Sequence, residues 1–370
     1  GSAICISDMN TLLQSIAAGR AVAREDLGPL LALFEPGDQE ALFKAAYAMK
    51  LKQVGPKVYF RGIIEYSNIC EKNCYYCGIR RDNRKVRRFQ MTREEILGAA
   101  KWAHASRYGS IVLQGGERQD KKHAEFIEDI LRVVKRETNG ELGITLSLGE
   151  QPRDTFERWF AAGGHRYLLR IETSNPRLYA KLHPADHSHA ARLQCLDDLK
   201  AIGYQVGTGV MIGLPDQTLD DLASDIEFFR ERDIDMIGMG PYIVHSETPL
   251  AAEMPDFAEK ARGQLDLALR MIAVTRLYLR DVNIASTTAL QALDAQGREM
   301  GLQAGANIIM PNITDTKYRD AYQLYENKPC LDENAALCRN CLQRRVESVG
   351  ETIGFGEWGD SPHFQKRTGS

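Results

Sequence analysis

The chain has 370 residues, 44% of them hydrophobic, which is enough to bury the core of one large α/β unit or of two ordinary domains. Its 47 Lys and Arg residues nearly balance 50 Asp and Glu residues, and a net charge of −3 excludes binding of nucleic acid or an anionic membrane through a global positive field. No run of about 18 apolar residues and no signal-peptide pattern is present, so we expect a cytoplasmic protein without a membrane-spanning helix.

The predicted elements succeed one another in a regular order. Residues 7–52 predict helices, broken at "EPGD", that cap one end of the main domain. Over residues 53–314, short β-branched runs alternate with amphipathic segments, which is typical of βα units around a parallel sheet. Thr92 and Thr218 occupy N-cap positions, each with an acidic residue three places on. The expected strands are 57–68, 110–117, 143–150, 166–172, 205–213, 235–243, 283–289 and 306–313. This pattern predicts an α/β fold, a complete (β/α)8 TIM-type barrel, with a Cys-bearing C-terminal extension at 315–370.

The strand 166–172 indicates what fills this barrel. Because side chains alternate along a strand, one face carries only Tyr167, Leu169 and Ile171, and this apolar face must meet the helices. The opposite face, which points into the barrel, carries Arg166, Leu168, Arg170 and Glu172. Two other strands place polar residues on one face in the same way, at Arg61, Glu65, Thr145 and Ser147. We expect a polar reaction chamber; the alternative is an internal Arg and Glu network that only holds the barrel together.

Three cysteines, Cys70, Cys74 and Cys77, directly follow the first strand, at the mouth where barrel enzymes carry their sites. A structural zinc site normally closes with four ligands, and the next thiol along the chain is Cys195. Three thiolates are what a 4Fe–4S cluster needs if one iron is to stay open. The CxxxCxxC spacing at this position therefore favours such a cluster over zinc or an inert loop.

The motifs around this loop resemble those of the radical S-adenosylmethionine (SAM) superfamily. The resemblance implies that the open iron binds SAM and that electron transfer cleaves SAM to a 5′-deoxyadenosyl radical. It also implies that SAM is contacted by Tyr76, beside the last cysteine, and by the "GGE" segment Gly115, Gly116 and Glu117. The segment "GVMIGLP", residues 209–215, resembles the strand that lies beside the adenine.

Several longer segments, among them "EYSNICEKNCYYCGIRRDN", "RYLLRIETSNP" and "DMIGMGPYIVHSETPL", resemble the HydE family of FeFe-hydrogenase maturases from about residue 40 onward. By this resemblance Glu172 and Arg192 would contact SAM. The chamber would be lined by Thr145, Arg166, Arg170, Met236, Thr287, Thr288, Met310, Tyr322 and Tyr325. A family member carries "RHE" where this chain has Ile171 between Arg170 and Glu172. Ile171 has the helix-facing parity, so we expect a packing change; the alternative is a HydE-like paralogue with another substrate.

A second group of cysteines, Cys330, Cys338 and Cys341, lies beyond the last expected strand. Its spacing resembles an auxiliary iron–sulfur site, 2Fe–2S or 4Fe–4S, that some HydE members have and others lack. With three thiolates, a fourth ligand would be water or another group, and zinc or no metal are the alternatives. Cys5 and Cys195 are interpreted as ordinary thiols.

Two further segments are rich in groups that bind metals or anions. His183, His187 and His189 have a spacing that could bind a metal, but no cysteine or further acid joins them, so a solvated loop is favoured. The segment 80–88 holds six basic residues beside the barrel mouth. It either attracts an anionic substrate or partner or is a solvated face.

The residues and the resemblance together predict a radical SAM maturase of HydE type, acting in assembly of the diiron precursor of the FeFe-hydrogenase H-cluster. The implied substrate is a cysteine-bound iron carbonyl or cyanide complex. The implied partners are other hydrogenase maturation proteins and an electron donor such as a flavodoxin or ferredoxin, with no nucleic acid and no membrane. The alternatives are a PylB-like radical SAM mutase or methylase relative acting on an amino acid, and a noncatalytic iron–sulfur carrier or scaffold. Cleavage of SAM would separate the enzymes from the carrier.

Overall fold

The structure is a computed structural model that describes residues 6–370, with side chains from residue 8 onward, so Cys5 lies outside the described part of the chain. Parallel strands form the centre of the molecule in the order β10, β1, β2, β3, β4, β5, β7 and β9. Their bounds are β1 Lys57–Ser67, β2 Ser110–Gly115, β3 Gly143–Ser147, β4 Arg166–Leu168, β5 Gln205–Thr208, β7 Met236–Ile237, β9 Asn283–Ile284 and β10 Ile308–Ile309.

The two ends of this strand order meet, so the sheet closes. Ala285 forms a parallel bridge with Ile308, and the Ser286 N–H donates to the Ile308 carbonyl at 2.8 Å. The Asn307 N–H donates to the Ile284 carbonyl, also at 2.8 Å. The predicted eight-stranded barrel is therefore confirmed. At its C-terminal end, β6 (Met211–Ile212) and β8 (Gly240–Pro241) pair with each other and extend the wall.

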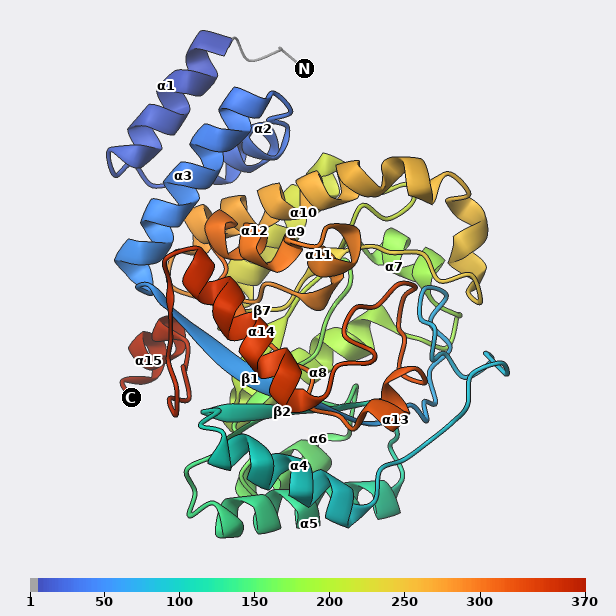
Figure 1. Ribbon diagram of the computed structural model, residues 1–370. Helices are drawn as coiled ribbons and strands as arrows, with labels where there is room; N and C mark the ends of the chain where they lie inside the picture. The colour runs from blue at the N-terminus through green and yellow to red at the C-terminus, as the bar shows by residue number, and fades with distance from the viewer. Residues whose placement is uncertain (1–5) are drawn as a thin grey trace.

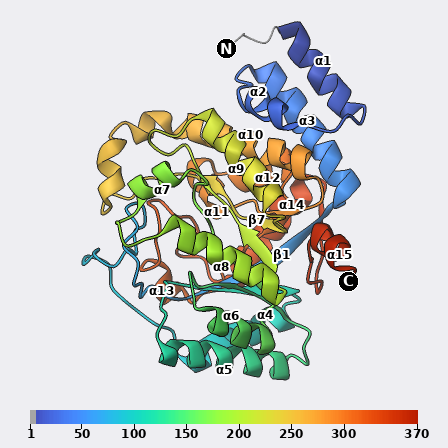
Figure 2. The same ribbon diagram turned by 180° about the vertical axis from the view of Figure 1, so that it is seen from behind.

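Helices surround the barrel and connect its strands (Figure 1, Figure 2). Thr92 and Thr218 form the expected capping boxes, because each hydroxyl accepts a backbone N–H three residues on and each backbone N–H donates to the acid there. The longer helices are α4 Arg93–Ala105, α5 Lys121–Glu137, α6 Arg153–Ala161, α8 His189–Ile202, α9 Leu219–Glu231, α10 Phe257–Leu279, α12 Gly297–Ala304 and α14 Ala335–Ser348. Short ones are α7 Pro176–Leu182, η2 Pro249–Glu253, α11 Thr288–Leu293 and α13 Thr316–Arg319.

The first helices pack on the outside of this layer. They are α1 Ile6–Ala17, η1 Arg24–Asp26, α2 Leu27–Leu31 and α3 Pro36–Gln53. In Figure 1 they lie above α10 and α12; α2 contacts α9 and α10, and α3 contacts α10 and α12. Lys50 of α3 is fully buried and pairs with Glu351 at 2.6 Å. This ion pair links the first helices to the last part of the chain.

The alternation predicted for residues 166–172 is present in the structure. Tyr167, Leu169 and Ile171 are at most 2% exposed, and the ring of Tyr167 packs against Phe156 of α6 at 5.0 Å. Leu168 has the opposite parity and lines a cavity inside the barrel. The helix-facing position of Ile171 agrees with the interpretation of this residue as a packing change.

The last segment of the chain closes the N-terminal end of the barrel. β11 (Thr352–Ile353) pairs with β1 at Lys57 and Val58. Beyond it, residues 358–361 run under the strands. Residues 358–360 accept hydrogen bonds from the side chains of Arg61, Arg166, Gln205 and Asn283, and the Ser361 N–H donates to Gln205. The helix α15 (Pro362–Thr368) follows. Because the bottom is filled, access to the barrel interior is from the opposite mouth.

Candidate active site

The loop after β1 carries the first three cysteines, and buried polar side chains fix its shape. Asn68 is fully buried; its amide donates to the carbonyls of Arg87 and Ala321 and accepts from the Phe89 N–H. Arg88 donates to four loop carbonyls within 3.1 Å, those of Asn68, Ile79, Arg80 and Asn83. The loop is therefore held from inside, without a regular element.

Cys70, Cys74 and Cys77 are free thiols, and each is half-buried. Burial raises the pKa of all three, that of Cys74 to about 12. A zinc ion with four sulfur ligands at about 2.3 Å requires sulfur atoms roughly 3.8 Å apart. Among the described residues, the only group of three or more cysteine, histidine or acidic side chains whose ligand atoms all lie within 4.8 Å of one another is elsewhere, in the tail. At least one pair of the three thiols is therefore more than 4.8 Å apart, a spacing wider than that around one zinc ion and compatible with the corners of a cubane.

The "GGE" segment at the end of β2 is bonded to this loop. The Glu117 N–H donates to Cys70 Sγ at 3.3 Å, and the Glu71 N–H donates to the Glu117 carbonyl at 2.9 Å. A Cβ atom on Gly116 would lie 2.2 Å from the Ile69 carbonyl oxygen, and one on Gly115 would lie 2.4 Å from the Tyr66 ring. Only glycine permits this approach of the strand end to the cysteine loop.

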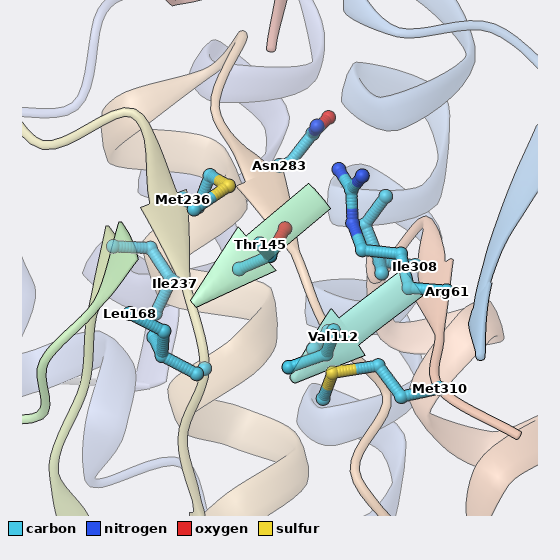
Figure 3. Close-up of a pocket in the computed structure, with 11 residues that line it drawn as sticks. Arg61, Val112, Thr145, Leu168, Met236, Ile237, Asn283, Ile308 and Met310 are labelled. Carbon is cyan, nitrogen blue, oxygen red and sulfur yellow. The ribbon is translucent and has the colours of Figure 1, made fainter. Parts of the chain in front are cut away.

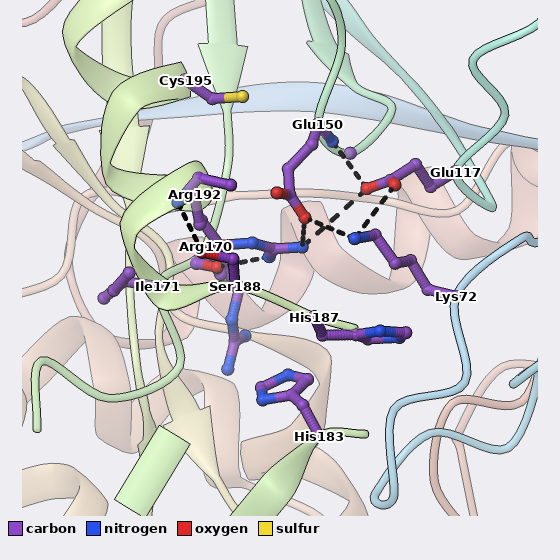
Figure 4. A network of polar contacts seen from close by, with 12 residues as sticks. Lys72, Glu117, Glu150, Arg170, Ile171, His183, His187, Ser188, Arg192 and Cys195 are labelled. Atoms are coloured by element: carbon purple, nitrogen blue, oxygen red, sulfur yellow. Dashed lines mark hydrogen bonds and ion pairs between the residues drawn. The ribbon is translucent and has the colours of Figure 1, made fainter. Parts of the chain in front are cut away.

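A buried network of charges borders the loop (Figure 4). Lys72 lies 3.0 Å from Glu150 and 3.6 Å from Glu117, and Arg192 lies 3.2 Å from Glu150. Burial and the charge of Glu150 raise the pKa of Glu117, whereas Arg192 and Lys72 outweigh burial and lower the pKa of Glu150. Arg192 Nε is buried and has no hydrogen-bond partner. The network thus leaves one donor free for a ligand acceptor.

Lys72 and Glu150 were missed in the sequence as site residues. Lys72 lies between Cys70 and Cys74, and Glu150 ends the expected strand 143–150. A lysine between two cysteines and an acid at the end of a barrel strand are the signals that point to them.

Arg170 and Glu172 lie beside this network, just beyond β4. Arg170 Nε donates to Glu172 Oε1 at 2.8 Å, and the Arg170 carbonyl accepts from Arg192 Nη1 at 2.7 Å. Glu172 has a φ of +65°, a left-handed conformation that a non-glycine residue rarely adopts. Its backbone is held there by bonds with Gly209 and Met211 on both sides. The structure therefore brings Arg170, Glu172 and Arg192 together.

Tyr76 and two of the histidines form one cluster. The Tyr76 hydroxyl lies 3.0 Å from His183 Nε2, and the Asn73 N–H donates to His187 Nε2 at 2.9 Å. His183 is 3% exposed and His187 is 8% exposed. The prediction of a solvated histidine loop is wrong for these two residues, because they are buried against the cysteine loop and support it.

The predicted chamber residues fall into two levels. A cavity of about 30 Å³ inside the barrel is lined by Thr145, Met236 and Met310, whose side chains converge in Figure 3. This volume holds one or two water molecules. The other predicted chamber residues lie outside this cavity lining. Thr287 caps α11 and Thr288 is its first residue, and the Tyr322 hydroxyl accepts a hydrogen bond from Gln114 at 3.3 Å. Burial raises the pKa of the Tyr325 hydroxyl. A substrate larger than water would therefore lie above the cavity, towards the mouth.

Arg166 does not line this cavity, and its hydrogen bonds are with Thr145, Ser110 and the segment at the barrel bottom. Its fully buried guanidinium donates to Thr145 Oγ1 at 2.8 Å, to the Trp358 carbonyl at 3.0 Å and to Asp360 Oδ1 at 2.7 Å, with a further bond to Ser110. Arg166 therefore binds the segment that closes the barrel bottom. For this residue the contacts favour the alternative of an internal structural network.

The tail cysteines are brought together only in part. The ligand atoms of Cys330 and Cys338 lie within 4.8 Å of each other and of a Glu333 carboxylate oxygen. Cys341 is outside this group, and its sulfur accepts from Arg345 Nε at 3.4 Å. Cys195 is buried in α8 with its sulfur 3.7 Å from the Gln151 carbonyl, which agrees with an ordinary thiol.

Comparison with known proteins identifies the class. Residues 64–229, from β1 to α9, match the Radical SAM superfamily. A crystal structure of the methylornithine synthase PylB has a TM-score of 0.77 at 24% identity, covering 93% of this chain and 98% of that chain, so the two share a fold. The chain is therefore a radical SAM enzyme, a class that depends on SAM and a 4Fe–4S cluster.

Two curated relatives narrow the class further. The chain is 46% identical over 340 residues to the FeFe-hydrogenase maturase subunit HydE of Thermotoga maritima, covering 92% of this chain and 94% of that protein. It is 26% identical over 355 residues to 3-methylornithine synthase of Methanosarcina barkeri, covering 94% and 95%. The chain belongs to the HydE family of FeFe-hydrogenase maturases. In residues 6–370, no helix has the length and apolar character that crossing a membrane requires.

Proposed function

We propose that this chain cleaves SAM reductively and directs the resulting radical chemistry at an iron-containing precursor of the FeFe-hydrogenase diiron unit. The relative from Thermotoga maritima supports this role, since it is named a maturase subunit of that hydrogenase. The observation that carries the proposal is the set of three thiols at the barrel mouth, bonded to the glycine segment and bordered by the partnerless Arg192 Nε.

Cys70, Cys74 and Cys77 would hold three irons of a 4Fe–4S cluster, leaving the fourth iron for SAM. When bound, the cluster supplies the electron that breaks a carbon–sulfur bond of SAM. The raised pKa values mean that the thiols stay protonated at neutral pH until iron displaces the protons. Cluster insertion should therefore release protons and become more favourable as the pH rises.

The charge network fits the methionine end of SAM, which carries a carboxylate, an ammonium and a sulfonium. Arg192 Nε would donate to the SAM carboxylate, satisfying a buried donor. Glu117 and Glu172 offer negative charge to the cationic groups, and the Gly115–Gly116 backbone permits close approach. Tyr76 would pack near the adenine, held in place by His183.

The substrate would lie below SAM and above the small cavity. Arg170 keeps 30% of its side chain exposed and is oriented by Glu172, so we assign to Arg170 the recognition of an anionic group such as a carboxylate or cyanide. Thr145, Met236 and Met310 would form the floor. Residues that would form the upper walls are Thr287, Thr288, Tyr322 and Tyr325.

The partners can be inferred from the same geometry. A small acidic electron carrier of the flavodoxin or ferredoxin type would reduce the cluster, because four exposed basic residues follow the cysteine loop, namely Arg81, Arg84, Lys85 and Arg87. Other hydrogenase maturation proteins would deliver the iron complex and receive the product. The sequence-based hypothesis of an auxiliary cluster on Cys330, Cys338 and Cys341 stays a proposal, separate from SAM cleavage.

The proposal is tested with anaerobically reconstituted protein, SAM and dithionite, by measuring released 5′-deoxyadenosine. Wild-type protein should release it, whereas the Cys70→Ser/Cys74→Ser/Cys77→Ser variant should not. Cys195→Ser, which removes a buried thiol away from the loop, is the matched control and should behave as wild type. Release at the wild-type rate from the triple variant would contradict the proposal.

The substrate is tested in the same assay by supplying a cysteine-bound iron carbonyl/cyanide complex. We expect consumption of that complex to accompany SAM cleavage. Free amino acids form the comparison, because the structural likeness to PylB makes an amino-acid mutase the second candidate. Turnover of an amino acid without turnover of the iron complex would favour the mutase.

A further inference from the structure

A cleft much larger than the inner cavity lies outside the barrel, at the N-terminal end of its strands. Its volume is about 600 Å³, whereas that of the cavity between the strands is about 30 Å³. Sites for small organic ligands usually have volumes of about 300–1,000 Å³. The walls come from the C-terminal ends of α9 and α10, from Val22 and Gln53, and from His363 and Lys366 of α15. The cleft is therefore separate from the cysteine loop, which lies at the opposite end of the barrel.

The floor of the cleft is apolar, and one of its rings is covered by a cation. Arg230 lies 5.0 Å from the centre of the Tyr278 ring and donates to its hydroxyl at 2.9 Å. Four apolar lining residues are at most 3% exposed, namely Phe229, Ile234, Leu277 and Val282. The floor thus offers an apolar surface to the carbon skeleton of a ligand.

The two acidic residues that line the cleft, Asp233 and Asp281, already have partners. Lys200 lies 3.2 Å from Asp233, and Lys366 lies 2.9 Å from Asp281. His363 contacts both carboxylates, and its hydrogen bonds to Asp281 and Asp233 raise its pKa. The negative charge of the cleft is therefore balanced by two lysines and a histidine.

Arg280 lines the same cleft without a partner. Across residues 6–370, its half-buried guanidinium makes no hydrogen bond, ion pair or ring contact. Because the acids beside it are already paired, no counterion within the cleft is left for it. A partly desolvated charge without a counterion is unfavourable, and an anionic ligand would relieve it.

The backbone holds Arg280 in a strained conformation. Its φ is +62° and its ψ is −73°, and the Asp281 N–H donates to the Leu279 carbonyl at 2.7 Å, which defines a γ-turn of the rare type. The fully buried Arg276 fixes this turn by donating to the carbonyls of Arg280 at 2.6 Å and Val282 at 2.7 Å. Glycine would adopt this conformation without strain. Strain that the surroundings impose in this way is found mainly at ligand sites and switches.

We propose that this cleft binds a small organic anion, whose phosphate or carboxylate group pairs with Arg280 and whose apolar part lies on the floor. A guanidinium matches both groups, because it can donate two parallel N–H bonds to a pair of oxygen atoms. Lys366 would add a second positive charge from α15. The ligand would thus connect the end of α10 with the helix that follows the closing segment of the barrel. The proposal does not depend on SAM cleavage and stands or fails separately.

The test is calorimetric titration of the reconstituted full chain with phenyl phosphate and with benzoate, at an ionic strength held constant with NaCl. Both probes carry an apolar ring, so a comparison of their affinities identifies the preferred anionic group. Benzyl alcohol, which has the ring without the charge, should not bind. Saturable binding of at least one anion is expected. The absence of binding by both, or equal binding of the neutral probe, would overturn the proposal.

Two substitutions of Arg280 assign the binding to the cleft. Arg280→Gln should weaken binding of the preferred anion by 10-fold or more. Arg136→Gln is the matched control, because it also removes an exposed arginine at the end of a helix, α5, and it should bind as wild type does. Binding elsewhere in the chain is common to all variants, so the difference isolates the cleft.

Arg280→Gly separates ligand binding from a purely structural role. Glycine keeps the γ-turn and relieves its strain, so this variant should fold while losing the anion as Arg280→Gln does. An anion affinity of Arg280→Gly or Arg280→Gln equal to that of wild type would overturn the proposal, whatever their melting temperatures.

Discussion

Replacing Arg166 by Gln separates the structural role of this residue from the substrate-binding role that its parity suggested. The substitution removes the guanidinium from a fully buried position between Thr145 and Asp360. The Asp360 side chain is 22% exposed, and its carboxylate would lose the partner that lies 2.7 Å away. Although burial opposes the shift, His165 and Arg166 hold the pKa of Asp360 below its usual range, so the carboxylate stays charged at neutral pH.

The magnitude is set by the loss of one partner of a largely buried ion pair, which destabilises a protein by about 3–5 kcal/mol. For a chain of 370 residues the entropy of unfolding is ~0.8 kcal/mol/K, so the melting temperature should fall by about 4–6 °C. Removing both charges leaves no unpaired ion. The double variant Arg166→Met/Asp360→Asn should therefore be more stable than the sum of its single variants predicts.

The assay is thermal unfolding of reconstituted protein, combined with SAM affinity and product yield per folded molecule. Arg166→Gln should melt earlier, yet bind SAM and turn over substrate normally at temperatures where it is folded. Arg170→Gln is the comparison, with an expected loss of at least 10-fold in substrate turnover and little change in melting. The reasoning is refuted if Arg166→Gln melts within 1 °C of wild type and loses turnover instead.

Three other perturbations test the site and its supports. Lys72→Met should weaken SAM binding about 10-fold in calorimetry, because the two neighbouring carboxylates then compete for Arg192; Lys121→Met, at an exposed position, should not. Gly116→Ala should lower the iron content to half of the wild-type value or less, because its Cβ would meet the Ile69 carbonyl oxygen. Gly98→Ala is the control: its Cβ has open space on α4, and the substitution should raise the melting temperature. Burial raises the pKa of Asp225 from 3.8 to about 7, so the folded state keeps a proton that the unfolded state loses, and stability falls as the pH rises from about 4 to 7. Asp225→Asn should remove this loss of stability. The melting temperature of the variant should equal that of wild type near pH 4 and exceed it at pH 8. A variant whose melting temperature equals that of wild type at both pH values would contradict the stated pKa.

Local rules predicted much of the fold. The order of the eight strands follows from β-branched runs and turn residues, and both capping boxes follow from a threonine with an acid three places on. Period-two alternation placed Tyr167 and Ile171 against the helices. The cysteine loop was predictable because its three cysteines lie within eight residues of one another.

Contacts between distant segments were the part that could not be predicted. The parity of a residue predicts which face of a strand it occupies, but not whether its side chain lies near the top or the bottom of the barrel. Arg166 lies at the bottom because it pairs with Asp360, which is 194 residues away in the sequence. The pairing of Lys72 with Glu150 joins two strand ends that only the closed barrel brings together. In the tail, the proximity of Glu333 to the thiols of Cys330 and Cys338 could not be seen in the spacing of the cysteines.

The closure of the barrel bottom has a consequence for biosynthesis. Strand β1 pairs with β10 and β11, and Arg61 and Arg166 donate to backbone carbonyls and a carboxylate at residues 358–360. On the ribosome, the first two-thirds of the chain would emerge without these acceptors and with β1 open along one edge. Folding dominated by such late, distant pairings is slow and exposes strand edges to aggregation. We expect the apoprotein to need chaperone protection until residues 352–361 have been made, and the cysteine loop to receive its iron only afterwards.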